Sequence, residues 1–140
     1  EDQGRVACFA LRALAGKTVH VYGDGKQVRD VLCIDDLVRA YEAAYTYIEK
    51  TAGQIYNIGG GPQYALSVIE LLTMLKEQFP AFSWDYNDWR PGDQKIYVSS
   101  YAKATKEFSW KPEIDPKEGV ARLIAWITAN RALFTDQFGG

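Results

Sequence analysis

Residues 21–40 read VYGDGKQVRDVLCIDDLVRA, and this stretch decides the fold class. It begins in an apolar strand candidate, Thr18–Tyr22, and turns at Gly23-Asp24-Gly25, a composition typical of tight turns. A second apolar run, Val31–Ile34, predicts another short strand. A helix is expected next, with Asp35 as its N-cap, because apolar residues recur at helical spacing. The residues of that apolar face are Leu37, Tyr41, Ala44 and Ile48.

The segments on either side continue this mixture of strands and helices. A helix is predicted over residues 3–15, a strand over Gln54–Ile58, and a helix after the capping box Ser67-x-x-Glu70. The predictions that complete the chain are strands at Phe82–Tyr86 and Lys95–Val98, a short helix after Ser99, and a last helix from Asp115-Pro116. No repeat or linker interrupts the pattern, so residues 1–140 are expected to form a single mixed α/β unit.

Amino-acid composition indicates which classes of binding partner and which cellular compartment to expect. The 140 residues are 47% apolar and carry a formal net charge of −2, which favours a globular domain and gives no electrostatic case for nucleic acid. No apolar run approaches the roughly 18 residues that a membrane span requires, so no membrane partner is expected. Cys8 and Cys33 are expected to be free thiols in a reducing cytoplasm, with a disulfide between them as the alternative.

Most constellations of catalytic residues do not occur in this sequence. The single histidine, His20, lies in a strand pattern without a nucleophile motif, which favours a structural role. No Cys/His cluster suggests zinc, so no metal site is expected. Gly59-Gly60-Gly61 follows a predicted strand but lacks the G-x-G-x-x-G spacing and the lysine of a phosphate loop. A turn between a strand and a helix is the better interpretation.

Two arginine motifs have the chemistry to bind a ligand. Arg29-Asp30 follows the glycine turn, and Arg90-Pro91-Gly92-Asp93 follows an aromatic segment. The planar guanidinium group donates two parallel hydrogen bonds, which suits a diphosphate, and a carboxylate such as Asp93 accepts from sugar hydroxyls. The alternative is that both arginines pair with surface carboxylates, an interaction of little energetic weight. Residue chemistry alone favours neither.

The ordered set of motifs resembles a known family. E-D-Q-G-R-V-A-x-F at 1–9 is followed by residues 21–40, by Y-N-I-G-G-G at 56–61, by W-R-P-G-D-Q at 89–94 and by W-K-P at 110–112. This succession is similar to the C-terminal, substrate-binding portion of NAD-dependent nucleotide-sugar epimerases and dehydratases, the extended short-chain dehydrogenase/reductase family. Within it, the motifs look most like the epimerases of CDP-sugars. The resemblance implies an α/β fold that lacks most of the Rossmann sheet.

The resemblance also implies roles for individual residues in binding a nucleotide sugar. Arg29 and Arg90 match the arginines that bind the diphosphate, and Asp93 matches the aspartate that contacts the ribose. The strand at Val21 and Tyr22 resembles the one that lies against the nucleobase, and Gln3 falls in the segment that lines the substrate pocket. Asp35 resembles a structural helix cap. Ser109 occupies a helix end that usually carries glycine, and Arg5 stands where the CDP-sugar enzymes often have tryptophan.

The rest of the enzyme is expected outside this chain. Residue 1 is Glu, and a helical pattern begins almost at once, so we expect a piece of a longer protein. The family's glycine-rich NAD loop and its catalytic Tyr-x-x-x-Lys pair would lie upstream. The resemblance therefore implies no catalytic residue here, no tight NAD binding and no activity of the chain alone. Without its N-terminal NAD-binding domain the chain is expected to expose apolar surface and to self-associate.

Two alternatives stay open at the level of the sequence. The chain could derive from a nucleotide-sugar 4,6-dehydratase or a 4-epimerase, which differ from the 2-epimerases in residues outside it. It could also be a non-catalytic carbohydrate-binding or interaction module whose aromatic residues stack against sugars.

Overall fold

The computed structural model describes residues 4–134, which form two compact units. Unit 1 comprises three segments of the chain. The first ends at Gln27, the second runs from Ser67 to Lys95, and the third begins at Val120. Unit 2 comprises Val28–Leu66 and Ile96–Gly119. The sequence pattern predicts that residues 1–140 form a single unit. Whether the two compact units combine into one is not tested by this division, so that expectation stays a prediction. The mixed α/β class is confirmed, because both units contain helices and short parallel strands.

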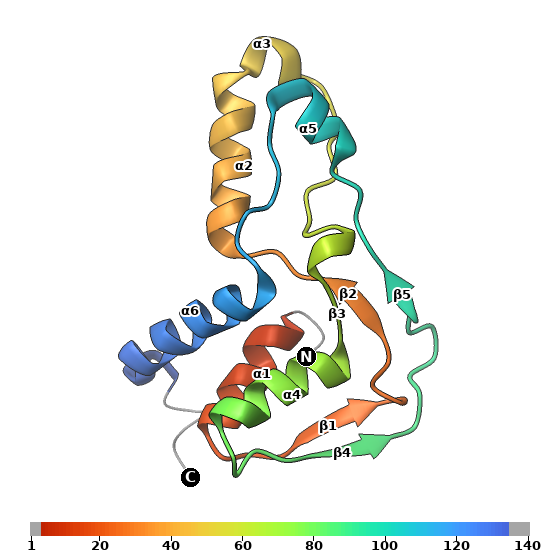
Figure 1. The fold of residues 1–140 in the computed structure, drawn as a ribbon, viewed down its shortest axis with the longest axis vertical. Helices are drawn as coiled ribbons and strands as arrows, with labels where there is room; N and C mark the ends of the chain where they lie inside the picture. Colours follow the sequence, from red (N-terminus) through yellow and green to blue (C-terminus); the bar gives the residue numbers. More distant parts are fainter. Residues whose placement is uncertain (1–3, 135–140) are drawn as a thin grey trace. The chain divides into compact units, whose positions relative to one another are not determined.

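Unit 1 is built on a pair of parallel strands. β1 (Val19–Tyr22) and β4 (Trp84–Asn87) lie side by side and run in the same direction, with Val19 opposite Trp84 and Tyr22 opposite Asn87 (Figure 1). The helices of this unit are α1 (Arg5–Leu14), α4 (Val68–Gln78) and most of α6 (Pro116–Ala129), followed by a 3-10 turn at Arg131–Phe134.

The core of unit 1 explains which side chains of β1 face outward. Val19 and Val21 are buried, whereas His20 and Tyr22 alternate with them on the exposed side, as the two-residue period of a strand requires. The buried residues that pack with the two valines come from all three helices and from the segment before β4: Ala10, Ala13, Val68, Leu71, Leu72, Leu75, Phe82, Val120, Ile124 and Ile127. Tyr22 is therefore presented outward by its strand register.

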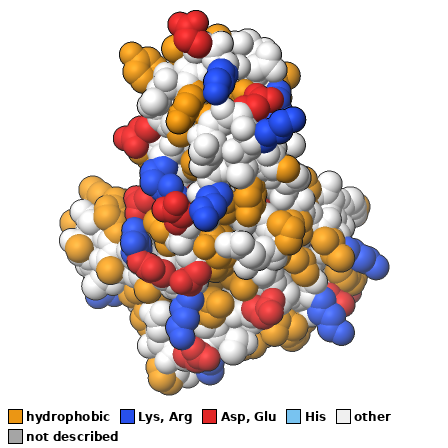
Figure 2. Space-filling view, turned by 45° about the horizontal axis from the view of Figure 1, so that its top comes forward, with side chains coloured by type: hydrophobic (Ala, Val, Ile, Leu, Met, Phe, Trp, Pro, Cys, Tyr) orange, Lys and Arg blue, Asp and Glu red, His pale blue; other side chains and the backbone are white. Residues whose placement is uncertain are grey.

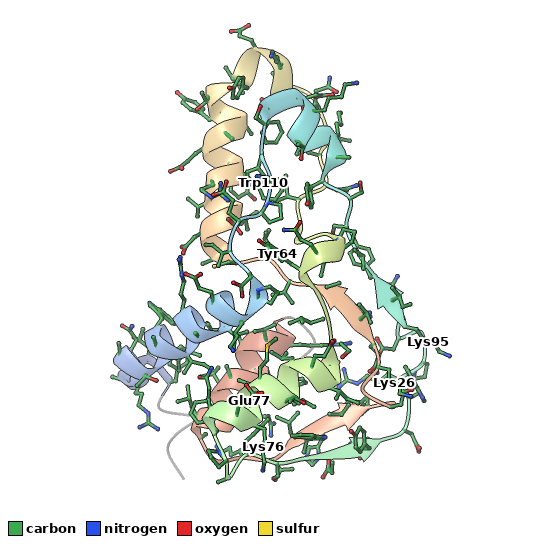
Figure 3. All side chains as sticks on the ribbon, viewed as in Figure 1. Lys26, Tyr64, Lys76, Glu77, Lys95 and Trp110 are labelled. Atoms are coloured by element: carbon green, nitrogen blue, oxygen red, sulfur yellow. The ribbon has the colours of Figure 1, made fainter. Side chains whose placement is uncertain are left out.

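Unit 2 contains a small sheet and four helical segments. The strand order is β3 (Ala65–Ser67), β2 (Val28–Asp30), β5 (Ile96–Tyr97), and β2 pairs with β5 in parallel. The helices are α2 (Ile34–Thr46), α3 (Ile48–Thr51) and α5 (Ala102–Phe108), with a 3-10 turn at Pro62–Tyr64. Its core consists of Ala40, Ala104, Phe108 and Trp110, and Trp110 lies between α2 and α5 (Figure 3).

A buried carboxylate fixes the start of α2, and it is not the one that the sequence suggested. The expected cap, Asp35, is exposed in the first turn, while Cys33 occupies the N-cap position and its side chain makes no capping hydrogen bond. Asp36 is fully buried and accepts hydrogen bonds from Arg39 and from the backbone amides of Glu113 (3.1 Å) and Ile114 (3.0 Å). Asp36 thus satisfies amides from a distant loop rather than those of its own helix.

Two predicted strands are wrong. Val31–Ile34 is not a strand, because the extended segment is the preceding Val28–Asp30, and Ile34 already begins α2. A short apolar run does not distinguish the end of a strand from the first turn of a helix. Gln54–Ile58 has no regular structure, since none of the described residues forms a ladder with it, and Ile55 is 86% exposed.

Three features of the helix ends are confirmed. Ser67 and Glu70 form the predicted capping box at the start of α4, which lowers the pKa of Glu70 through hydrogen bonds from the Ser67 side chain and amide. Asp115 accepts a hydrogen bond from the Glu118 amide (3.0 Å) as α6 begins. Ser109, after α5, adopts a left-handed conformation with φ 58° and ψ 22°, which normally favours glycine.

The surface carries no membrane-spanning element in the part of the chain that the structure describes, where no helix is both long and apolar enough to cross a bilayer. On the face drawn in Figure 2, acidic and basic side chains are interspersed rather than gathered into one basic patch. This distribution agrees with the near-neutral net charge.

Candidate functional site

The most concentrated polar chemistry of unit 1 lies where β1 and β4 end. Because the two strands are parallel and in register, the turns that follow them meet at the same edge. Lys26 and Lys95 lie in these following segments, at the same end of the strand pair (Figure 3). We define the strand-end cluster as Arg5, Tyr22, Gln27, Arg90 and Asp93.

Tyr22 and Arg90 form the outer part of the strand-end cluster. The guanidinium carbon of Arg90 lies 3.7 Å from the centre of the Tyr22 ring, and Tyr22 is 37% exposed. Stacking of this kind holds a planar cation by its attraction to the face of an aromatic ring. The pair therefore holds the positive charge of Arg90 over one face of a partly exposed ring.

The Arg90–Asp93 turn brings a carboxylate to the same place. The Asp93 amide donates to the Arg90 carbonyl (3.2 Å), and Gly92 adopts a positive φ of 77° that closes the turn. Only 10% of the Asp93 side chain is exposed, and its Oδ1 lies 3.2 Å from Nη2 of Arg5. Gln27 donates to Asp93 Oδ2 (3.3 Å) and to the carbonyl of Tyr22.

Close packing accounts for the glycines of the first turn. A Cβ on Gly23 would lie 2.7 Å from the Trp89 indole, and one on Gly25 would lie 2.7 Å from Ile69. Both glycines also have positive φ, 80° and 74°. The turn after β1 is therefore shaped to seat Trp89, the residue that precedes Arg90.

A pocket of about 440 Å³ adjoins the strand-end cluster. Its lining combines two aromatic rings with two carboxylates: Gly23, Asp24, Tyr86, Asn87, Asp88 and Trp89. The negative charges of Asp24 and Asp88 would repel a phosphate, whereas the half-exposed rings of Tyr86 and Trp89 can stack against a base or a sugar ring. Arg90 and this pocket thus offer different chemistry to different parts of a ligand.

The other predicted ligand residues are distributed differently. Val21 is buried in the core of unit 1, so only its backbone could meet a ligand. Arg29 belongs to unit 2, where it lies opposite Tyr97 in the sheet and donates to the Val28 carbonyl (2.8 Å). Gln3 lies outside the described residues. Arg90, Asp93 and Tyr22 are the predicted ligand residues that the structure brings together.

The triple glycine of unit 2 has a structural explanation. A Cβ on Gly59 would lie 2.5 Å from Asp30 Oδ2, one on Gly60 would lie 2.1 Å from the Val31 carbonyl, and one on Gly61 would lie 2.4 Å from the Tyr101 ring. The Gly61 amide donates to Asp30 (3.0 Å). The glycines let the chain pass close to its neighbours, which gives the triple glycine a packing role. A 3-10 turn and β3 follow it, not the helix that the sequence suggested.

Other expected roles can be placed as well. His20 Nδ1 lies 2.5 Å from Asp85 Oδ1 across the two strands of unit 1, an exposed pair that agrees with a structural role. Cys8 and Cys33 are both free thiols, and both are half-buried. The described residues contain no cluster of His, Cys, Asp or Glu that could hold a metal ion.

Comparison with known proteins agrees with the motifs. Residues 1–59 match the NAD dependent epimerase/dehydratase family. The chain is 32% identical over 135 residues to CDP-paratose 2-epimerase of Salmonella typhi. The aligned region covers 91% of this chain and 40% of the relative. The chain is related to the NAD-dependent epimerases and dehydratases. This is the relationship that the ordered motifs predicted.

Two further relatives show the breadth of the similarity. A dTDP-glucose 4,6-dehydratase of an Actinoplanes species is 34% identical over 132 residues, with 93% of this chain and 40% of the relative covered. The structure of UDP-glucose 4-epimerase of Thermotoga maritima with UDP-glucose matches with a TM-score of 0.83 at 32% identity, over 94% of this chain and 41% of that one. The chain spans about 40% of the length of the curated relatives that it matches.

One motif of these epimerases and dehydratases needs a correction. Tyr22 and Lys26 have the Tyr-x-x-x-Lys spacing, which the sequence analysis overlooked. A tyrosine and a lysine four residues apart lie side by side on one turn of a helix, but here Tyr22 ends a strand, and Gly23 and Gly25 turn the chain before Lys26. This pair therefore does not reproduce a helical tyrosine–lysine pair, and the expectation of a catalytic pair outside the chain is unchanged.

Gln27 and Asp36 are buried polar residues that the motifs do not predict. Gln27 is 2% exposed and Asp36 is fully buried, although residues of these types are mostly found at the surface. Burial raises the pKa of the Asp36 carboxyl, but hydrogen bonds from Arg39 and from the Ile114 and Glu113 amides outweigh it and lower the pKa below its ordinary value. Periodicity could have flagged Asp36, which stands four residues before the core residue Ala40 on the same helix face.

Proposed function

We propose that this chain is the nucleotide-sugar-binding part of an NAD-dependent sugar epimerase of the CDP-paratose 2-epimerase (CDP-tyvelose epimerase) type. The observation that carries this proposal is the arrangement of three side chains in unit 1. Arg90 is stacked 3.7 Å above the Tyr22 ring, and Asp93 closes the same turn as a nearly buried carboxylate. A ring for a base, a cation for phosphate and an acceptor for hydroxyls are the groups that a nucleoside diphosphate requires.

Each predicted residue has a role in this proposal. Tyr22, with the backbone of Val21, lies towards the base, and Asp93 accepts from the ribose hydroxyls. Arg90 and Arg29 bind the diphosphate, and Gln3 lines the sugar pocket. Relatives support the ligand class, because one solved structure with 32% identity is an epimerase with UDP-glucose and the CDP-sugar relative has the same identity.

We propose that NAD is not held by this chain. Gly59–Gly61 lacks the G-x-G-x-x-G spacing of a dinucleotide loop, and a Cβ on any of these glycines would lie 2.5 Å or less from Asp30, Val31 or Tyr101. NAD, which takes up and returns a hydride in such enzymes, would be held by residues outside this chain. We therefore assign no catalytic residue here, and we expect neither tight NAD binding nor turnover by the chain alone.

Two alternatives compete with the CDP-sugar assignment. A 4,6-dehydratase or 4-epimerase origin is supported by relatives with 34% and 32% identity. A non-catalytic carbohydrate-binding module is supported by the exposed rings of Tyr86 and Trp89 at the pocket. The two alternatives differ in whether a diphosphate is needed for binding.

Isothermal titration calorimetry with CDP, UDP and dTDP tests the proposal. We expect CDP to bind most tightly and Arg90→Ala to weaken it roughly tenfold, the effect of one lost charge-assisted hydrogen bond. Arg12→Ala is the matched control, because Arg12 is an arginine of the same unit that donates only to the Thr18 carbonyl among the bonds described here. Binding that is unaffected by Arg90→Ala, or binding of free sugars only, would reject the diphosphate role.

The same proposal includes partners and location. Besides the nucleotide sugar, the proposed partner is the NAD-binding domain of the whole enzyme, and the isolated chain is expected to self-associate through apolar surface. A cytoplasmic location is proposed from the two free cysteines. No nucleic acid or membrane partner is proposed.

A further inference from the structure

The carboxylate of Asp93 is held at both of its oxygens. Arg5 Nη2 lies 3.2 Å from Oδ1, and Gln27 Nε2 lies 3.3 Å from Oδ2. The two donors come from different elements, since Arg5 begins α1 and Gln27 follows the glycine turn after β1. A carboxylate with a donor on each oxygen is restrained from rotating about its terminal bond.

The orientation of the Gln27 amide follows from its neighbours. Its nitrogen faces the Tyr22 carbonyl and the Asp93 carboxylate, which are both acceptors. If the amide were flipped, its oxygen would face two acceptors and both hydrogen bonds would be lost. Gln27 therefore acts as a double donor that joins the backbone of Tyr22 to the side chain of Asp93.

This arrangement carries a free-energy penalty. Gln27 is 2% exposed, and no donor among residues 4–134 reaches its Oε1 atom. An unsatisfied buried acceptor is unfavourable for folding, and an apolar side chain of similar size would avoid it. A buried glutamine at this position is thus explained better by what its nitrogen holds than by stability.

We propose that Gln27 and Arg5 are positioning residues for Asp93 and thereby set the recognition of the ribose hydroxyls. The inference rests on the proposed function, in which Asp93 accepts hydrogen bonds from the ribose. Because Gln27 also holds the Tyr22 carbonyl, the residue proposed to lie towards the base and the residue proposed at the ribose are joined to each other before a ligand arrives. Preorganised acceptors of this kind discriminate strongly against analogues that lack the hydroxyl groups.

The test measures the ratio of the dissociation constants of 2′,3′-dideoxy-CDP and CDP. For the wild-type chain we expect CDP to be preferred by about tenfold or more, as expected for hydrogen bonds to a charged acceptor. Gln27→Leu should reduce this preference to about twofold, and its continued binding of the dideoxy analogue would show that the variant is folded. Arg5→Gln should reduce the preference by a smaller factor, because Arg5 is 35% exposed.

A second substitution and a control guard against misfolding. Gln27→Glu keeps the size of the side chain but places a carboxylate against Asp93 and the Tyr22 carbonyl, so it should also lower the preference. Thr51→Val removes another buried polar group, the hydroxyl that donates to the Ala44 carbonyl in unit 2, and should leave the ratio unchanged.

The outcomes separate this inference from the function on which it rests. If the wild-type chain binds no CDP, or if Asp93→Ala leaves the ratio unchanged, the proposed roles of the ligand residues fall and this inference falls with them. If Asp93→Ala abolishes the preference but Gln27→Leu and Gln27→Glu both retain it, the positioning role alone is overturned.

Discussion

Gly23 lies directly against the indole ring of Trp89. A Cβ placed on Gly23 would be 2.7 Å from Cδ2 of that ring, closer than any stable contact between carbon atoms. Trp89 precedes Arg90, so this glycine sets the position of the turn that carries the proposed phosphate ligand. Gly23→Ala must displace Trp89 in addition to straining a backbone with φ 80°.

The first prediction compares Gly23→Ala with Gly16→Ala. Gly16 has a similar φ of 66°, but a Cβ there would meet no atom within 4 Å. We expect Gly16→Ala to lower the free energy of unfolding by about 1–2 kcal/mol, the strain of a left-handed residue. Gly23→Ala should lower it by a further 1–3 kcal/mol or so, as in overpacked sites. Urea unfolding measures both, and equal losses would contradict the packing argument.

The second prediction concerns acid stability and Asp36. Its pKa is lowered in the folded state, so the carboxylate contributes stability that is fully present above its unfolded-state pKa near 3.8 and is lost as the pH falls towards the lower native pKa. Asp36→Asn should lower the free energy of unfolding by about 1–3 kcal/mol at pH 7, the typical effect of removing a charged acceptor from buried donors such as the Glu113 and Ile114 amides. It should also reduce the loss of stability below about pH 4.

Asp35→Asn is the matched control for Asp36→Asn. Asp35 is the neighbouring aspartate in the first turn of α2, but it is exposed. Its replacement should change the free energy of unfolding by less than about 1 kcal/mol. If thermal unfolding followed between pH 2 and 7 gave the same profile for both variants, Asp36 would not be the buried anchor described here.

The fold could be predicted from sequence where local chemistry decides. The capping box at Ser67, the cap at Asp115 and the turn at Gly23 each depend on residues within a few positions of one another, and all three are found. The strand expected at Gln54–Ile58 failed because a strand exists only with a partner, and the local sequence does not specify one.

The candidate site shows the same division. Arg90, Tyr22 and Asp93 were singled out by motif, but nothing in the sequence brings Gln27 to Asp93, which is 66 residues away. The parallel register of β1 and β4 creates that contact. Asp36 was missed for a similar reason, since its partners Glu113 and Ile114 arrive from 77 and 78 residues along the chain.

The third prediction uses the left-handed residue Ser109. Replacing it with glycine removes the strain of φ 58° but adds flexibility to the unfolded chain, so a net gain of about 0.5 kcal/mol is expected. Ser109→Ala keeps the strain and should give no gain. Differential scanning calorimetry of the two variants checks this, and a gain with alanine equal to that with glycine would rule out the backbone explanation.

The last prediction concerns the exposed apolar face of α2. Ile34, Val38, Tyr41 and Tyr45 are 66%, 48%, 69% and 79% exposed, and they recur at alternating intervals of four and three residues. This spacing places them on one stripe of the helix, the pattern of a surface that packs against another element. The stripe continues to Ile48 in α3, which is 49% exposed. Because the chain spans about 40% of its relatives, we expect this stripe to be covered in the whole enzyme and to drive self-association of the isolated chain.

Size-exclusion chromatography with light scattering measures this association. The wild-type chain should show a mass above that of a 15.8 kDa monomer that rises with concentration. The double variant Tyr41→Lys, Tyr45→Lys should shift towards the monomer, since two charges on the stripe oppose its burial. Leu133→Lys is the control, because Leu133 is equally exposed at 70% but lies in unit 1, away from the stripe in the sequence. A wild-type chain that is monomeric at every concentration and binds no apolar dye would contradict the prediction. Equal effects of the double variant and of Leu133→Lys would show that the α2 stripe is not the surface that associates.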